Sequence, residues 1–324
     1  MFPQHSNETI QKPLAERSRL YFEELQRTIC SALESLEPEK RFSDDRWEKA
    51  DARHSDKSGG GGLSKVLEGG EIFEKAGVLT STTYGGLPEA LALKMNVPPT
   101  NYSASGISLI IHPLNPMVPT VHANFRYFEQ ARLNSESGGG QAHGDSWFGG
   151  GVDLTPYYLY EEDVRHFHST IKSACDKHNA DYYPRFKKWC DEYFFVKHRE
   201  EARGVGGAFF DYLRGDAEHY FELVQSVGNS FLDAYLPIVR KRMNELWGEK
   251  ERIWQAIRRG RYVEFNLVYD RGTTFGLETK GRIESILVSL PPKVEWHYNF
   301  NPEPNSREAK LVEVLKHPKD WAKF

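Results

Sequence analysis

Apolar and polar side chains alternate along Pro119–Phe128, the pattern of a β-strand whose two faces differ. One face is apolar and is expected to pack on a core: Val121, Ala123, Phe125 and Tyr127. The other face carries an imidazole, an amide and a guanidinium: His122, Asn124 and Arg126. Such a face suits an anionic ligand, although a polar face exposed to water has the same pattern.

A second alternating segment, Gly106–His112, precedes the first. Ser108 and His112 fall on one face of it, and three branched apolar residues fall on the other. The connection, residues 113–119, contains three prolines and cannot continue a hydrogen-bonded ladder. The two segments therefore predict a β-hairpin that brings the two polar faces together.

Strand and helix patterns occupy most of the remaining chain. Further strand patterns cover 78–83, 147–153, 205–213, 262–269, 283–290 and 293–299. Helical periodicity covers 14–36, 161–178, 184–195, 217–247, 249–258 and 306–315. Short turns join several strands, and strand and helix do not alternate strictly. This predicts an α+β fold, with a large antiparallel β-sheet flanked by helices on both sides, in a single domain over residues 1–324.

Three segments are expected to be irregular. Residues 133–146 are small, polar and glycine-rich and predict a mobile surface loop, and residues 1–13 are expected to be flexible. Four consecutive glycines, Gly59–Gly62, are not expected in regular structure and would allow a turn or a close approach to a ligand. The residues around Lys65 do not match a phosphate-binding loop.

Composition and charge exclude several classes of protein. Aromatic residues make up 13 % of the 324 residues, which suits a large core and a flat apolar ligand. The net charge of −4 gives no electrostatic basis for binding nucleic acid. Three cysteines without C-x-x-C spacing indicate a reduced compartment, and neither a disulfide framework nor a zinc knuckle. No apolar run approaches the ~20 residues of a membrane span, and residues 1–8 do not resemble a leader, so we expect a cytoplasmic protein.

Histidines and a carboxylate supply candidate chemistry. Asp153 follows three glycines, which leave room for a ligand beside its carboxylate. With Asp153, four histidines offer metal-ligand types, although no HxH or HExxH occurs among them: His112, His122, His168 and His198. A metal site and acid–base or hydrogen-bonding roles both remain open for them.

Arginines are the third signal. Each alone is most often a surface cation, but together they indicate a ligand with several carboxylates, because a guanidinium binds a carboxylate through two hydrogen bonds. They lie on or beside predicted strands and turns: Arg126, Arg199, Arg203 and Arg282.

Motifs that run in order through almost the whole chain resemble the oxygen-dependent coproporphyrinogen III oxidases. They include 59–62, 73–78, 111–116, 119–128, 147–156, 187–194, 197–199, 204–207, 258–272 and 281–287. The resemblance implies oxidative decarboxylation of two propionates of coproporphyrinogen III to vinyl groups, giving protoporphyrinogen IX in haem biosynthesis. It implies that O2 is the oxidant and that no cofactor is required, while a bound divalent metal such as Mn stays open. It also implies a homodimer whose subunits contact each other through about 262–297.

The resemblance also implies roles for individual residues. The substrate contacts would be Ser108, Asn124, Phe125, Arg126, Asp153, Lys280, Gly281 and Arg282. The catalytic residues would be His122 as proton donor, Asp153, Arg126 and Arg203, and the four histidines match positions proposed as metal ligands. Our mechanistic hypothesis is that Asp153 accepts hydrogen bonds from pyrrole N–H groups and promotes their deprotonation, after which the electron-rich pyrrole reacts with O2 directly.

Two departures from the family pattern concern the rim of the site. The loop 133–146 is long with Ser146 in place of an aromatic residue, and Lys280 replaces a common glycine. Two other functions stay open. A metal-dependent oxidase built on the four histidines would lose activity on chelation, and a non-catalytic tetrapyrrole carrier would bind without releasing CO2.

Overall fold

The computed structural model describes residues 12–50, 58–87, 89, 92–93, 100–130, 145–278 and 281–322. The helices are α1 (Leu14–Glu34), α3 (Glu161–Asp176), α4 (Tyr182–Tyr193), α5 (Ala217–Asn229), α6 (Phe231–Arg242), α7 (Glu249–Val268), α8 (Arg271–Glu278), α9 (Ile283–Leu287) and α10 (Arg307–Lys316). The strands are β1 (Ser43–Ala50), β2 (Gly59–Glu68), β3 (Phe73–Gly86), β4 (Asn101–Pro113), β5 (Thr120–Gln130), β6 (Ser146–Thr155), β7 (Phe195–Val196), β8 (Glu201–Ala202) and β9 (Gly206–Leu213).

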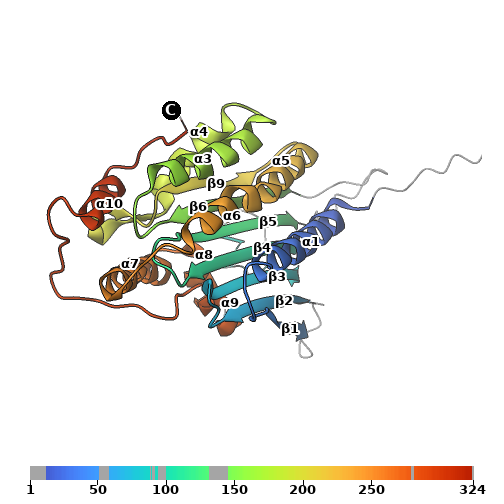
Figure 1. Ribbon diagram of the computed structural model, residues 1–324. Coiled ribbons are helices and arrows are strands. Elements are labelled where there is room, and N and C mark those ends of the chain that lie inside the picture. Colours follow the sequence, from blue (N-terminus) through green and yellow to red (C-terminus); the bar gives the residue numbers. More distant parts are fainter. Residues whose placement is uncertain are drawn as a thin grey trace, which may run out of the picture.

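A seven-stranded antiparallel sheet organises the molecule (Figure 1), with the strand order β1-β2-β3-β4-β5-β6-β9. The hairpin predicted from the two alternating segments is confirmed, because β4 pairs with β5 and Ser108 lies opposite Asn124. β7 and β8 form a separate two-stranded ribbon. The fold is therefore the α+β class that the sequence predicted.

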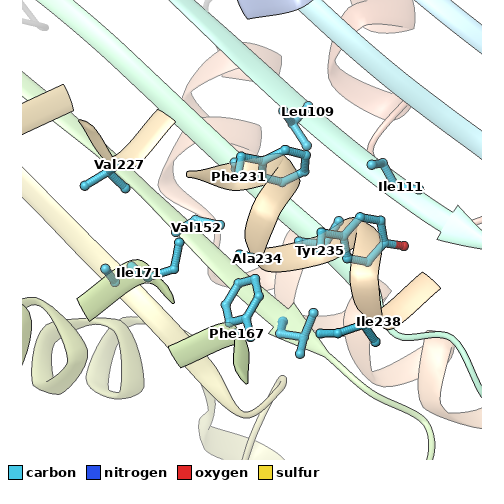
Figure 2. Packing of buried hydrophobic residues seen from close by; sticks show 14 of the residues in the cluster. Leu109, Ile111, Val152, Phe167, Ile171, Val227, Phe231, Ala234, Tyr235 and Ile238 are labelled. Atoms are coloured by element: carbon cyan, nitrogen blue, oxygen red, sulfur yellow. The ribbon is translucent and has the colours of Figure 1, made fainter. Parts of the chain in front are cut away.

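One face of the sheet carries the main hydrophobic core, beneath α1, α3, α5 and α6 (Figure 1). The amphipathic period of α1 places Phe22, Leu25, Ile29 and Leu33 against the sheet. Figure 2 shows apolar side chains of α6 packed close to those of the strands and of α3: Phe231, Ala234, Tyr235, Ile238, Leu109, Ile111, Val152, Phe167 and Ile171.

The opposite face of the sheet lies under the chain from α7 to α9. Arg259 of α7 donates from Nη2 to the Pro113 carbonyl, 2.8 Å away, at the end of β4. Ser285 of α9 is 3.3 Å from Ser64 of β2, measured between their hydroxyl oxygens. α4 runs along β9, so helices cover both faces and one edge of the sheet.

Three predicted strands are wrong. Residues 262–268 form the end of α7, residues 283–287 form α9, and residues 293–299 form neither strand nor helix. The aromatic and β-branched residues at 262–269 favour strands. In a half-buried segment, however, packing against the rest of the molecule decides between strand and helix. Tyr262, Val263 and Phe265 are buried there on one side of a helix that continues from residue 249.

The four consecutive glycines also differ from expectation. Gly59–Gly62 lie in β2 and pair on both sides, with Trp47–Ala50 of β1 and Ser81–Tyr84 of β3. Gly62 has room for the Trp47 indole because it lacks a Cβ, which would lie 2.8 Å from that ring. The predicted helical stretch 217–247 is two helices, α5 and α6, that meet at Ser230.

Several expectations fall on residues outside the described part of the chain. These are the flexible segment up to residue 11, the loop 133–146 up to residue 144, and Lys280. Ser146 already belongs to β6. Among the described residues, no helix combines the length and the apolar character that crossing a bilayer requires.

Candidate active site

A cavity of about 890 Å³ lies between the second face of the sheet and the chain from α7 to α9. Three small residues on adjoining strands of the sheet contribute to its floor: Gly77, Ser108 and Gly151. Its aromatic lining includes Tyr193, Phe194, Phe209, Tyr262 and Tyr269. Its polar lining includes His122, Asn124, Arg126, Arg203, Asp211, Asn266 and Asp270. Such a cavity fits a flat apolar ligand that carries anionic groups.

His122 and Asp153 are direct partners in the β5–β6 register, so their side chains rise side by side on the cavity face of the sheet. His122 Nδ1 lies 2.8 Å from Asp153 Oδ1. The other carboxylate oxygen, Oδ2, accepts a hydrogen bond of 2.7 Å from Arg203 Nη2. The three side chains form a continuous imidazole–carboxylate–guanidinium cluster.

Burial and charge set the protonation state of this cluster. The side chains of Asp153 and Arg203 are only 3 % and 2 % exposed. Burial alone would raise the pKa of Asp153, but the Arg203 guanidinium and the hydrogen bond from His122 outweigh it and hold that pKa below its ordinary value. Asp153 is therefore a carboxylate at neutral pH, and Nδ1 of His122 carries the shared proton. Nε2 is then the ring nitrogen that remains for exchange with a ligand.

Arg203 is held by aromatic rings and by one amide. Its guanidinium carbon lies 4.0 Å from the centre of the Phe194 ring, 4.5 Å from that of Tyr262 and 4.9 Å from that of Phe265. Its Nη1 donates to Asn266 Oδ1 at 2.9 Å. The planar guanidinium stacks among these rings and donates to Asp153 and to Asn266 from different nitrogens. The single ammonium of a lysine could not make the same set of contacts.

Arg126 forms a second polar group on the same face. Its Nη2 donates to Asp211 Oδ2 at 2.6 Å, and its Nη1 donates to Asn124 Oδ1 at 3.2 Å. The Arg126 side chain is 39 % exposed, whereas that of Asp211 is 8 % exposed. Arg126 is thus a cation at the cavity wall with a buried counter-charge behind it.

Phe125 and Asp153 do not line the cavity. The pleat of β5 turns the Phe125 side chain to the core and leaves it 1 % exposed, so the substrate contact expected from Phe125 stays a prediction. Asp153 lies behind His122 and is not among the described residues that line the cavity. Ser108, Asn124, Arg126 and Arg203 line it.

The predicted contacts just before α9 are not in the cavity. Arg282 donates to Asp45 of β1 and, at 3.4 Å, to Ser285 Oγ of α9. Gly281 precedes the same helix, and neither residue is among the described residues lining the cavity. This stretch therefore attaches α9 to the β1 side of the sheet.

The structure does not bring the four histidines together. His112 contacts Thr120 Oγ1 at 3.2 Å and the Ser289 carbonyl at 3.0 Å, and His168 contacts the Tyr183 hydroxyl at 2.6 Å. Both are fully buried, and burial lowers the pKa of each well below its usual range, so both are neutral.

His198 is bonded on both ring nitrogens, to the Tyr269 hydroxyl at 2.8 Å and to Glu264 Oε2 at 2.7 Å. Within the described ranges, no three side chains of His, Cys, Asp or Glu are grouped as metal ligands. The histidines thus occupy separate hydrogen-bonding positions, and the described residues do not fit a four-histidine metal site.

Four of the cavity residues that sequence reasoning missed matter most for the site. Three of them, Tyr262, Asn266 and Asp270, are spaced by four and line the cavity from the face of α7 and the residue just before α8. That spacing was a readable signal, but the interpretation of 262–269 as a strand concealed it. The fourth, Asp211, lies on β9 next to Tyr212, and no motif marked it.

Comparison with known proteins gives a family match. The model of the family described as "Coproporphyrinogen III oxidase" matches residues 17–321. Over 319 residues, 95 % of this chain and 78 % of the relative, the chain is 49 % identical to "Oxygen-dependent coproporphyrinogen-III oxidase" of Drosophila melanogaster.

Two plant relatives match to the same degree. Identity is 50 % over 306 residues with "Oxygen-dependent coproporphyrinogen-III oxidase, chloroplastic" of Glycine max, covering 92 % of this chain and 77 % of the relative. Identity is 48 % over 304 residues with "Coproporphyrinogen-III oxidase 1, chloroplastic" of Arabidopsis thaliana, covering 91 % of this chain and 76 % of the relative.

Proposed function

The chain belongs to the coproporphyrinogen III oxidase family, and we propose that the cavity over β3–β6 and β9 is its active site. The enzyme is an oxidoreductase of haem biosynthesis that oxidatively decarboxylates coproporphyrinogen III with O2. The observation that carries the proposal for the site is the His122–Asp153–Arg203 cluster on the same sheet face as Arg126.

Each turnover has a simple balance. A propionic acid arm and O2 give a vinyl group, CO2 and H2O2, so the arm loses its carboxyl carbon, two hydrogens and two electrons. The protein must therefore position one arm, hold its carboxylate and move protons. The pyrrole supplies the electrons, which a cofactor would supply in most oxidases.

We assign Arg126 to the reacting propionate and His122 to proton transfer. A guanidinium at the cavity wall positions the arm, and such positioning supplies a large part of a rate enhancement. Nε2 of His122 would exchange the proton with the substrate, while Asp153 fixes the ring through Nδ1.

Asp153 then acts through His122, which modifies our initial hypothesis. A direct bond from a pyrrole N–H to Asp153 requires the His122–Asp153 contact to open, because both carboxylate oxygens have partners and the side chain is 3 % exposed. We therefore propose that the pyrrole N–H groups meet His122, with Asp153 and Arg203 setting its orientation and charge.

We also propose that the reaction needs no metal. The measurement is anaerobic mixing of the enzyme with reduced coproporphyrinogen III, followed by admission of air, with CO2 and vinyl product followed with and without chelator. We expect equal amounts of product with and without the chelator. Product lost only with chelator would favour the metal-dependent oxidase, and binding without any product would favour a tetrapyrrole carrier, which the family match does not support.

We further propose a homodimer. Six large apolar side chains are exposed in one stretch of the chain: Leu267, Val268, Leu277, Ile283, Trp296 and Tyr298. An apolar surface of this kind usually marks an interface. Sedimentation equilibrium is expected to give about twice the chain mass of 37.3 kDa, and the Trp296→Glu variant is expected to shift it towards that single-chain mass.

The single catalytic domain over residues 1–324 and the cytoplasmic location stay predictions. Two of the relatives carry the word chloroplastic in their names.

A further inference from the structure

Asp211 has no part in the reaction as described so far, although it lines the cavity. Its carboxylate is 8 % exposed and accepts the short hydrogen bond from Arg126. Arg126 is the residue that we assign to the reacting propionate. The buried Asp211 carboxylate is thus paired with Arg126, the same cation that must bind the propionate of the substrate.

The backbone around Asp211 is shaped to bring these two side chains together. A Cβ on Gly149 would lie 2.6 Å from Asp211 Oδ1 and 2.8 Å from Arg126 Nε, so only glycine leaves space for the contact. The β6–β9 register shifts between Phe148 and Gly150 at this level. Tyr212 has a φ of +50°, and its N–H donates to Asp211 Oδ1 at 2.9 Å. The sheet therefore departs from regular pairing where Asp211 meets Arg126.

The pairing has a consequence for every propionate that reaches Arg126. A guanidinium carries five N–H donors, and Asp211 and Asn124 engage Nη2 and Nη1. An incoming carboxylate must share the cation with Asp211 or displace it, and two carboxylates so close repel each other. Asp211 therefore weakens the binding of each arm at this position.

Weakened binding is useful because one cavity must process two arms of one macrocycle. The vinyl group that forms is neutral, and the product still carries two propionates that would occupy Arg126. We propose that Asp211 is a positioning residue. After each decarboxylation its carboxylate pairs with Arg126 again and keeps the remaining propionates from staying bound there, so that the macrocycle turns or leaves. This inference rests on the proposed function and extends it to the exchange of arms.

The test compares the wild type with Asp211→Asn and Asp211→Ser, because serine keeps an acceptor for the Tyr212 N–H. We expect KM for coproporphyrinogen III to fall about tenfold, and inhibition by the dipropionate product to tighten about tenfold. We expect kcat to fall, with the monovinyl intermediate accumulating between the two steps. A side chain that only supported the fold would not lower KM while lowering kcat.

Asp145→Asn is the matched control. Asp145 pairs with Arg214, and both side chains are about 40 % exposed; neither is among the described residues lining the cavity. The control removes the same charge from the same region of the sheet without touching Arg126. Equal effects in Asp145→Asn would overturn the proposal, because overall charge would then explain them.

A binding measurement separates this inference from the proposed function. Fluorescence titration with oxidised coproporphyrin III, and with its tetramethyl ester, needs no turnover. We expect about tenfold tighter binding of the acid to both Asp211 variants, and unchanged binding of the ester. Unchanged or weaker binding of the acid would overturn the role of Asp211. Failure of the wild type to release CO2 would overturn the proposed function and leave the titration valid.

Discussion

Replacing Asp153 with alanine is expected to abolish turnover and to destabilise the fold by about 3–5 kcal/mol. The variant leaves Arg203 without its carboxylate while the guanidinium is 2 % exposed, and an uncompensated buried charge is costly. It also frees His122 Nδ1, so that the ring loses its orientation. Denaturant unfolding and CO2 release measure the two losses. Asp153→Asn keeps the shape of the side chain and is expected to lose activity with less loss of stability.

Glu201→Ala is the matched control for stability. Glu201 Oε1 accepts a hydrogen bond of 2.7 Å from Arg258 Nη1, and the two side chains are 7 % and 4 % exposed, much like the Asp153–Arg203 pair. Glu201 is not among the described residues that line the cavity. We expect a similar loss of stability with turnover retained by the folded fraction. Near-normal activity in Asp153→Ala would remove that residue from the mechanism.

The pH dependence of this stability loss follows from the sign of the pKa shift. The pKa of Asp153 is lower in the folded protein than its ordinary value, so the folded state binds this proton more weakly than the unfolded chain does. The contribution of the pair is complete above the ordinary pKa and disappears as the pH falls through the folded pKa. The stability difference between wild type and Asp153→Ala is therefore expected to be constant above about pH 5.

Replacing His122 with asparagine is expected to lower kcat by about 10²–10⁴, the usual contribution of a general acid or base. KM is expected to change little, because Arg126 and the apolar walls supply most of the binding. Steady-state assays measure both parameters.

His198→Ala distinguishes proton transfer from metal binding. His198 belongs to the same predicted histidine set, but its ring nitrogens contact Tyr269 and Glu264 and it is not among the described residues lining the cavity. We expect nearly wild-type turnover from this variant. An equal loss in the two variants would contradict the assignment of His122 and return the four histidines to a shared metal site.

The alternation along β4 and β5 was sufficient to predict the hairpin and the polar face of the site. The period-two pattern leaves a single arrangement, in which His122, Asn124 and Arg126 point away from the core. The same rule turns the Phe125 side chain to the core, where the structure places it, and a substrate contact from Phe125 stays a prediction.

The chain from residue 249 to residue 299 shows where local pattern fails. Tyr262, Asn266 and Asp270 have helical spacing, yet the aromatic and β-branched residues between them also suit a strand. Packing of this segment against β4 and the β7–β8 ribbon decides for a helix, and no window of the sequence contains those contacts.

By itself the sequence determined the β4–β5 hairpin, its core face and the residue types that a polycarboxylate substrate requires, because these follow from periodicity and side-chain chemistry. The tertiary structure decided which charges meet. Asp153 meets Arg203 across 50 residues and Arg126 meets Asp211 across 85, through strand register and a loop that folds back over the sheet. Against the effect of burial, the Arg203 guanidinium and the hydrogen bond from His122 then hold the pKa of Asp153 below its ordinary value. No local pattern contains either effect, since both depend on atoms brought together only by the folded chain.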